Sequence, residues 1–257
     1  MVVATDKRRE HHGAGLCLPA VRSLPALPVL LLVAALMAAG CGGSDNKTTS
    51  TAAKPKAATA AQQQATTTSS TQKAECQKVT APKPKPAGNL QKPALKLDPS
   101  KSYTATVDTS CGTFDIALDV KQDPKTAASF DSLAGKGFYD DTTFHRVIQG
   151  FVIQGGDPEG NGQGGPGYKV VEPPPKNTKY TSGVVAMAKT EIEDPGTSGS
   201  QFFVVAGPDA QLPPDYAVLG KVTSGMDVVS TIDAVPTGPG DQPLDPVVIK
   251  KITVKES

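Results

Sequence analysis

The stretch FHRVIQGFVIQGGDP, Phe144 to Pro158, decides how the rest of the chain is interpreted. Apolar residues alternate with other residues in two short runs, and this period of two predicts β-strands. The closing Gly-Gly-Asp-Pro predicts a turn. An arginine, Arg146, lies in the first run, and a glutamine, Gln154, lies in the second. Two polar side chains kept close together in a small apolar sheet indicate a functional site.

The charges divide the chain into two parts. Residues 1–97 contain 13 Lys and Arg against 4 Asp and Glu, whereas residues 98–257 contain 13 against 21. The second part therefore has a net charge of −8. We expect no nucleic-acid binding by this part, because contacts to phosphate need clustered Lys and Arg. With about 160 residues it has the usual size of one domain.

The first forty residues have the pattern of a targeting segment. The positive residues Lys7, Arg8, Arg9 and Arg22 come first. The apolar run ALPVLLLVAALMAA (26–39) follows, and it is shorter than the ~20 residues of an ordinary membrane span. It ends in Ala-Ala-Gly before Cys41, which resembles the cleavage box of bacterial lipoproteins, where the thiol is acylated. We predict a lipoprotein signal peptide over 1–40 and lipidation at Cys41; the alternatives are an uncleaved anchor or an ordinary signal peptide.

Residues 41–97 are predicted to be a disordered spacer. The stretch is rich in Thr, Ala and Gln, and such a composition buries too little apolar area to offset the entropy of ordering. Near its end, PKPKP (82–86) favours extended polyproline geometry. The spacer would hold the domain away from a membrane. Its lysines would either contact anionic lipid or wall polymer, or remain solvated without a partner.

The four cysteines have separate expected fates. Cys17 precedes the predicted cleavage and Cys41 would carry lipid, which leaves Cys76 and Cys111. In a compartment that permits disulfides we predict a bond between these two; the alternative is a pair of free thiols. His11 and His12 also precede the cleavage, and no other Cys or His stands at ligand spacing from them. No metal site is therefore predicted.

The residues from 98 onward read as strands with only two helices. Tyr103–Val107 and Phe114–Val120 alternate and predict a hairpin. Asp123, followed by a proline, is predicted to cap a first helix. A second, short helix is predicted near Gly225–Ile232, and a last strand over 247–254. Many short strands with two helices predict an antiparallel barrel or sandwich.

Two motifs resemble known functional sites but lack the sequence context that those sites require. Gly160 to Gly165 fits the letters G-x-G-x-x-G, but prolines follow it where a nucleotide-binding helix would have to begin, so we expect a surface loop. Ser200 lies outside any G-x-S-x-G elbow. A Ser-His-Asp triad would have to use His145, whose neighbour Arg146 lies on the opposite face of the strand. We therefore expect neither a nucleotide site nor a hydrolase.

Five fragments together resemble the cyclophilin family of peptidyl-prolyl isomerases. They are Phe144-His145-Arg146, Phe151 to Asp157, Met187-Ala188, Gly199 to Phe203 and Asp215 to Val222, in the order of the family. The resemblance runs from about Tyr103 to the C-terminus. It implies a mainly β fold, a closed eight-stranded antiparallel barrel capped by two helices, with a peptide groove on its outside.

The resemblance also implies roles for individual residues. Arg146 would be the catalytic donor and Gln154 would steady the peptide or Arg146. The proline ring would be held by Phe151, Val152, Phe203 and Leu212. Ala188, Lys189 and Gln201 would line the rest of the groove, with His145 as a structural or scaffolding residue beside the substrate. No nucleophile, metal or cofactor is needed.

The sequence departs from the family at several positions around the groove. Lys189 stands where many relatives carry Asn, Val152 replaces a commoner Met, and Tyr216 replaces a frequent His. The loop 190–197 is longer and more acidic than usual. Gln211 lies where some relatives carry Trp, and the chain has no Trp. These changes leave Arg146 in place but disfavour tight binding of cyclosporin, the family's cyclic-peptide inhibitor.

The features combine into a prediction of function. We expect a lipid-anchored, extracytoplasmic peptidyl-prolyl isomerase at the outer face of the cytoplasmic membrane, acting as a monomer on proline-containing peptides and unfolded exported proteins. One alternative is a cyclophilin-like module that binds proline-containing peptides without turnover. Another is a holding chaperone with incidental isomerase activity.

Overall fold

The computed structural model describes residues 75–94 and 96–257. The predicted signal peptide, the lipidation site Cys41 and the spacer up to residue 74 lie outside these described residues. Within the described part of the chain, no helix has the length and apolar character that a membrane crossing requires.

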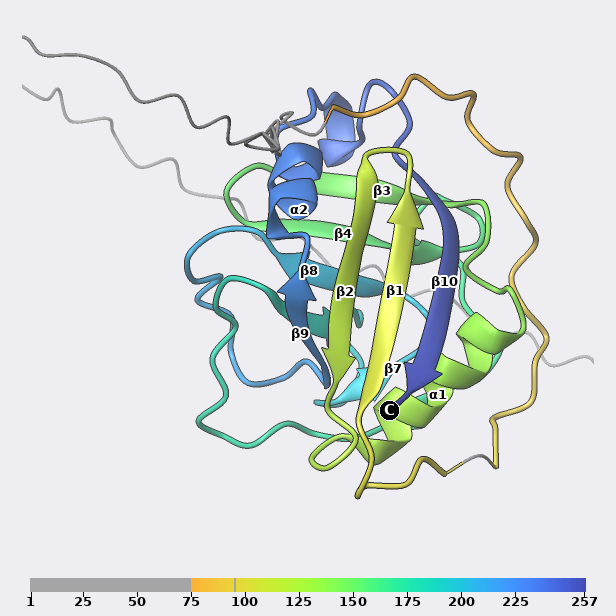
Figure 1. Ribbon diagram of the computed structural model, residues 1–257, viewed down its shortest axis with the longest axis vertical. Helices are drawn as coiled ribbons and strands as arrows, with labels where there is room; N and C mark the ends of the chain where they lie inside the picture. The colour runs from red at the N-terminus through yellow and green to blue at the C-terminus, as the bar shows by residue number, and fades with distance from the viewer. Residues whose placement is uncertain (1–74, 95) are drawn as a thin grey trace, which may run out of the picture. The chain divides into compact units, whose positions relative to one another are not determined.

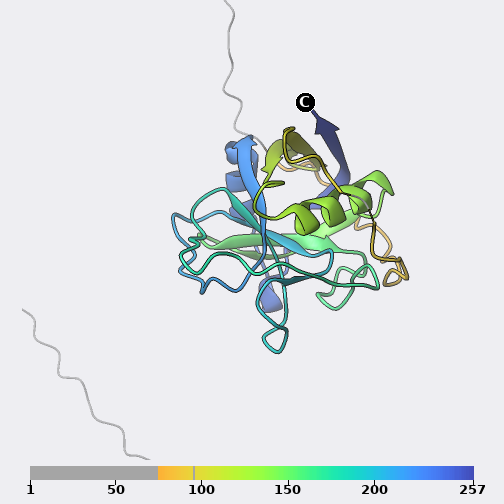
Figure 2. The same cartoon turned by 90° about the horizontal axis from the view of Figure 1, so that it is seen from below.

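The domain is built on a closed antiparallel barrel of eight strands (Figures 1 and 2), as predicted. Its strands are β1 (Tyr103–Thr109), β2 (Gly112–Leu118), β3 (Thr142–Ile148), β4 (Val152–Asp157), β6 (Val184–Met187), β8 (Phe202–Val205), β9 (Val218–Ser224) and β10 (Val248–Glu256). Around the barrel the order is β1-β10-β3-β4-β8-β6-β9-β2. The predicted hairpin and last strand are confirmed, with bounds shifted by one or two residues.

Both predicted helices are present. Helix α1 (Pro124–Gly135) packs against β10, β9 and the short strand β5 (Val170–Val171). Helix α2 (Met226–Asp233) packs against β2, β3 and β4. Figure 1 shows α2 at the upper left of the barrel and α1 at its lower right. The remaining elements are a small sheet of β5 (Val170–Val171) and β7 (Thr197–Ser198) and the 3-10 turn η1 (Pro239–Asp241).

The strands of one side of the barrel bury apolar residues on both faces. Successive side chains of a strand point to opposite faces. Thus Phe202 and Val204 of β8 join the main core, whereas Phe203 and Val205 join a separate cluster. That second cluster contains Val152, Tyr180, Ala186, Phe203, Val205 and Ala210. The outer face of β4, β8 and β6 therefore has an apolar surface of its own, and the site is built on it.

Residues 75–94, which we call the strap, run along the outside of the domain, in orange and yellow at the right of Figure 1. The predicted disulfide is confirmed: Cys76 is bonded to Cys111, between β1 and β2. Backbone hydrogen bonds also join the strap to the domain, among them Gln77 N–H to Ser110 O at 2.8 Å. The strap thus belongs structurally with the domain, although the sequence alone predicts spacer up to residue 97.

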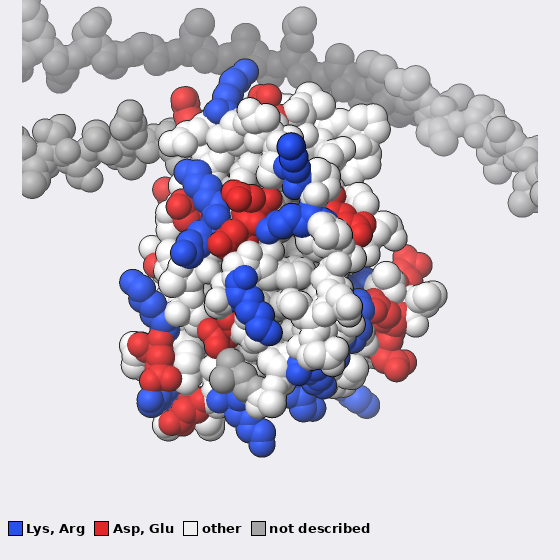
Figure 3. Space-filling view, turned by 90° about the vertical axis from the view of Figure 1, so that its right-hand side faces the viewer, with Lys and Arg blue, Asp and Glu red and all other residues white. Residues whose placement is uncertain are grey.

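Charges of both signs are mixed on the side of the domain that includes the strap. On the face that Figure 3 shows, Lys and Arg side chains lie next to Asp and Glu in small groups. Large uncharged areas separate these groups from one another. This face therefore offers no continuous basic surface of the kind that phosphate backbones require.

The start of α1 is capped differently from the prediction. Asp123 occupies the N-cap position, but its side chain makes no capping hydrogen bond. Instead the carboxylate of Glu172, which follows β5, accepts the backbone N–H groups of Lys125 at 3.2 Å and Thr126 at 2.8 Å. The prediction that the Asp123 side chain caps α1 was wrong, because the carboxylate of Glu172, distant in sequence, accepts these N–H groups instead.

Asp123 is left as a buried carboxyl group among like charges. It is 2% exposed. Burial, followed by repulsion from Glu172 and Asp119, raises the pKa of Asp123 from 3.8 to about 7. The positive end of the α1 dipole favours the charged form, but burial outweighs it. The folded protein therefore retains a proton on Asp123 between about pH 4 and 7 that the unfolded chain releases.

Replacement of Asp123 by Asn should stabilise the protein at high pH. The folded pKa lies above the unfolded value, so the wild type loses stability as the pH rises from about 4 to 7. At pH 8 we expect Asp123→Asn to raise the free energy of unfolding by about 1–3 kcal/mol, with the gain vanishing toward pH 4. Denaturant unfolding at both pH values measures this. Asp227→Asn, an exposed aspartate in the first turn of α2, is the control, and an equal effect of Asp123→Asn at both pH values would contradict the argument.

Candidate active site

A row of paired residues crosses the outer face of the barrel. Arg146 of β3 is opposite Gln154 of β4, and Gln154 is opposite Phe203 of β8. Phe203 is in turn opposite Ala186 of β6. Directly opposed residues of antiparallel strands project from the same face. The pairing therefore brings the arginine, the glutamine and the aromatic ring side by side, although their segments are far apart in sequence.

A β-bulge determines that Arg146 points outward. Phe144 pairs with Gly155 and Arg146 pairs with Gln154, so that His145 has no partner in the register. Phe144 belongs to the main core. In an unbroken strand, Arg146, two residues later, would face the same interior. The extra residue reverses the alternation and directs the guanidinium to the outer face.

Eight of the predicted site residues line one small hollow of about 130 Å³. Its lining consists of Arg146, Phe151, Val152, Gln154, Ala188, Lys189, Phe203, Leu212 and Tyr216. The apolar members belong to the outer cluster or pack against it. The hollow is thus an apolar socket with Arg146 and Gln154 on its rim.

A second hollow of about 150 Å³ adjoins the first. The two share Gln154, Ala188 and Lys189. The second hollow is more polar, and Gln201 lines it. Lys169 forms an ion pair with Glu193 at 2.9 Å at its edge. Burial opposes ionisation of Glu193, but hydrogen bonds from Thr190 and Lys169 prevail and lower the pKa of Glu193.

Two side chains hold the Arg146 guanidinium from different directions. Its Nε contacts the carboxylate of Asp241 at 3.3 Å, and its Nη1 donates to Gln154 Oε1 at 3.4 Å. The Nε2 of Gln154 donates in turn to Gln201 Oε1 at 3.1 Å. Arg146 is about 39% exposed, so its remaining N–H groups are available to a ligand. Sequence reasoning missed Asp241, because nothing local connects it with a strand 95 residues away.

His145 does not lie with the other predicted residues. It lines neither hollow but a separate cavity on the strap side of β3. The side chain is 8% exposed, and neither ring nitrogen has a hydrogen-bond partner. Burial, aided by the charge of Arg146, lowers the pKa of His145 despite the nearby Asp157. The expected position beside the substrate was wrong, because His145 faces this cavity and neither hollow; its buried ring fits the structural role instead.

Tyr180 is a site-supporting residue that the sequence did not reveal. Its hydroxyl donates to the backbone oxygen of Tyr216 at 2.7 Å and accepts the Tyr216 N–H at 3.0 Å. Burial raises the pKa of Tyr180 to about 12, although the hydrogen bond to Tyr216 opposes this. The Tyr216 ring packs edge-on against Phe203 at 5.5 Å, and the Lys189 ammonium lies 5.5 Å from its centre. Tyr180 thus fixes one wall of the apolar hollow.

The arrangement offers an apolar binding surface together with hydrogen-bond donors on its rim. Among the described residues, no group of three or more His, Cys, Asp or Glu side chains could hold a metal ion. The rim of the apolar hollow presents a permanently charged donor, Arg146. Such a site suits an uncharged substrate with an apolar ring and an atom that gains electron density during reaction.

The comparison with known families agrees with this geometry. Residues 104–254 match the family model described as cyclophilin type peptidyl-prolyl cis-trans isomerase/CLD. The chain belongs to this family. It is therefore a peptidyl-prolyl cis-trans isomerase, and the barrel with two helices is the cyclophilin fold.

The similarity to individual relatives extends over nearly the whole length of each relative. The chain is 41% identical over 152 residues to peptidyl-prolyl cis-trans isomerase-like 1 of Neurospora crassa, covering 58% of this chain and 91% of that protein. It is 40% identical over 174 residues to peptidyl-prolyl cis-trans isomerase A of Mycobacterium tuberculosis, covering 61% and 94%. A cyclophilin-type isomerase of Cryptosporidium parvum, crystallised in the presence of the dipeptide Ala-Pro, is 33% identical with a TM-score of 0.56 and covers 60% of this chain and 99% of that one.

Replacement of Tyr180 by Phe should weaken the wall of the apolar hollow. The change removes two hydrogen bonds to Tyr216 but retains the ring. We expect the free energy of unfolding to fall by about 1–2 kcal/mol. Because the wall and not Arg146 is affected, KM for an X–Pro peptide should rise several-fold while kcat changes little. The control is Tyr103→Phe. The Tyr103 hydroxyl donates to Glu256 at 2.9 Å, and this pair lies away from the site. An equal change of KM in both variants would contradict the role of Tyr180.

Proposed function

We propose that the apolar hollow holds the proline ring of an X–Pro bond and that Arg146 accelerates rotation about that bond. The observation that carries this proposal is the position of the guanidinium, on the rim of the hollow and beside Gln154. The crystal structure of the Cryptosporidium parvum relative in the presence of Ala-Pro supports a proline-containing ligand.

The mechanism requires one donor that acts mainly in the transition state. Rotation breaks the amide resonance and has a barrier of ~20 kcal/mol. In the twisted state the proline nitrogen becomes pyramidal and gains a lone pair. An N–H group of Arg146 aimed at that nitrogen would stabilise the transition state more than the planar substrate, which is the condition for acceleration. One charge-assisted hydrogen bond contributes ~1.5–3 kcal/mol, or a factor of about 10–150.

The rest of the acceleration would come from how the substrate is held. Phe151, Val152, Phe203 and Leu212 would bury the proline ring and exclude water, which strengthens the hydrogen bond from Arg146. Gln154 and Gln201 would orient the peptide across both hollows. Ala188 and Lys189 border both hollows and would contact the residues before the proline.

We further propose that the protein acts outside the cytoplasm, on a lipid anchor. The signal-like segment, the Cys41 box and the spacer support this placement. The Cys76–Cys111 bond adds support, because disulfides persist chiefly in oxidising compartments. The clients would be proline-containing segments of exported proteins, and the domain would act as a monomer at the outer face of the membrane.

Replacement of Arg146 by Ala should nearly abolish turnover in the full chain. Loss of the donor should lower kcat/KM about a hundredfold in a protease-coupled assay on a short X–Pro peptide. Arg146→Lys keeps the charge but loses the planar fork, and we expect an intermediate rate. Lys221→Ala, an exposed cation on β9, is the control and should match the wild type.

The same assay separates isomerase action from peptide binding alone. If Arg146→Ala isomerises the peptide as fast as the wild type, the assigned role of Arg146 is refuted. Background rates in the wild type, together with retained peptide binding, would instead favour a binding module. Protection of an aggregating client that survives Arg146→Ala would favour the chaperone alternative.

Replacement of Cys41 by Ser should release the protein from membranes. Full chains expressed in an exporting bacterium with an alkyne fatty acid would be tested for label and for partition into detergent. We expect label and detergent partition in the wild type and in the control Cys17→Ser, and loss of both in Cys41→Ser. Fatty-acid label that persists in Cys41→Ser would contradict lipidation at this residue.

A further inference from the structure

The strap is an addition to the domain that the family shares. The family match covers residues 104–254, so residues 75–94 lie outside it. A linker that only tethers a domain needs no contacts with it. The strap nevertheless makes a covalent bond and several hydrogen bonds to the loops of the domain.

Most of the strap's backbone hydrogen bonds end on one loop. We call residues 158–166, between β4 and β5, the Gly loop. Within it, Pro158 O accepts the Lys85 N–H at 2.8 Å and Gly165 O accepts the Gly88 N–H at 2.7 Å. Pro166 O accepts a third strap N–H, that of Leu90, at 2.8 Å. Such a series of backbone bonds holds two chain segments in a fixed register.

Side-chain contacts and close packing fix the same junction. The carboxylate of Glu159 in the Gly loop accepts the Ala87 N–H at 3.2 Å. The Lys85 ammonium donates to the backbone oxygens of Phe138 and Asp140. A Cβ at Gly88 would lie 2.9 Å from Pro166 O and 3.0 Å from the Phe138 ring. The strap therefore lies against the loop too closely to admit another side chain.

The Gly loop is held from inside the domain as well. Asp157 is fully buried, and its carboxylate accepts the backbone N–H groups of Glu159, Asn161 and Gly162. Gly164 passes so close to this carboxylate that a Cβ would collide with it. The loop is consequently fixed between Asp157 on one side and the strap on the other.

A chain of hydrogen bonds leads from the Gly loop to the active site. The Nε2 of Gln201 donates to Gly162 O at 3.1 Å and to Gly164 O at 2.9 Å. Gln201 Oε1 accepts from Gln154, whose own Oε1 accepts from Arg146. Because Gln201 uses its amide nitrogen on the loop, its oxygen is oriented toward Gln154. The position of the loop thus sets the orientation of the glutamine pair beside the guanidinium.

We propose that the strap is a positioning element of the active site, latched by Cys76–Cys111, that acts through the Gly loop, Gln201 and Gln154 on Arg146. This inference rests on the proposed function of Arg146. No strap residue lines either hollow, so the effect of the strap would be one of orientation and not of contact with the substrate.

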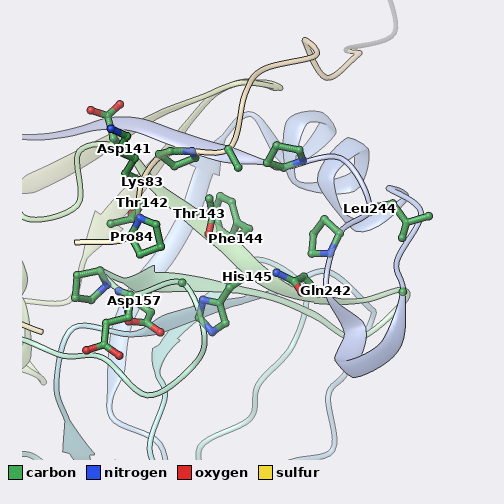
Figure 4. Close-up of a pocket in the computed structure, with 18 of the residues that line it drawn as sticks. Lys83, Pro84, Asp141, Thr142, Thr143, Phe144, His145, Asp157, Gln242 and Leu244 are labelled. Carbon is green, nitrogen blue, oxygen red and sulfur yellow. Dashed lines mark hydrogen bonds between the residues drawn. The ribbon is translucent and has the colours of Figure 1, made fainter. Parts of the chain in front are cut away.

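A second route from the strap to the site, past His145, is interrupted. A cavity of about 480 Å³ separates strap residues 81–84 from β3 (Figure 4). His145 and the segment around Gln242, next to Asp241, line its other walls. A displacement of the strap could be transmitted to β3 only through close packing, and the open space of the cavity interrupts that packing. The Gly loop is therefore the route on which the proposal depends.

The test is a double-mutant cycle in the full chain between Gly88 and Gln201. Gly88→Val displaces the strap from the loop, and Gly135→Val, where a Cβ meets nothing within 4 Å, is the matched control. We expect Gly88→Val to lower kcat/KM for an X–Pro peptide about 3–10-fold, which lies within the range of coupling between neighbours in one network. In a Gln201→Leu background, which breaks the chain of hydrogen bonds, Gly88→Val should have no further effect.

Each outcome decides between stated alternatives. Equal activity of Gly88→Val and Gly135→Val would overturn the positioning role. The role would also be overturned if Gly88→Val lowered kcat/KM equally in the wild type and in Gln201→Leu, because additive effects indicate independent sites. A wild type without turnover would overturn the proposed function instead. Thermal unfolding identifies a variant that does not fold. Glu159→Ala, which removes the acceptor of the Ala87 N–H from the loop side, then replaces Gly88→Val in the same cycle.

Discussion

The active site depends on a single extra residue in one strand. A barrel strand must alternate between interior and exterior, and Phe144 and Val147 both face the main core. Regular alternation cannot place two residues that are three apart on one face. The bulge at His145 resolves this conflict, and in doing so it directs Arg146 outward to Gln154. Both the position of the guanidinium on the rim of the hollow and its contact with Asp241 require that reversal.

The same strands carry two cores, and the second one makes the site. Neighbouring residues of β8 divide between them, with Phe202 in the barrel and Phe203 outside. An apolar cluster on the outside of a domain must be covered or used. Here Tyr180 and Tyr216 cover part of it through paired hydrogen bonds, and the uncovered remainder is the hollow beside Arg146. Because the rigid barrel supplies the floor of the hollow, substrate binding needs little ordering of the protein.

The sequence predicts the parts of this architecture that depend on local pattern or on family resemblance. Alternation over residues 103–107 and a proline after Asp123 locate elements correctly. Contacts between distant segments escape it: Glu172 caps α1 in place of Asp123, and Asp241 reaches Arg146 from the far end of the chain. The strap escapes it for another reason. Its composition predicts disorder when taken alone, and only the disulfide and the Gly loop supply the partners that order it.

Burial of His145 disfavours a second positive charge beside Arg146. A protonated imidazole next to the guanidinium would repel it, and the cavity beside β3 gives neither ring nitrogen a partner. Burial therefore lowers the pKa of His145 and favours the neutral ring beside the guanidinium. Asp241 then balances the guanidinium at Nε, which leaves the N–H groups of Nη2 to a ligand. A substrate that is neutral throughout the reaction meets one fixed positive donor, and no proton has to move for rotation about its peptide bond to be favoured.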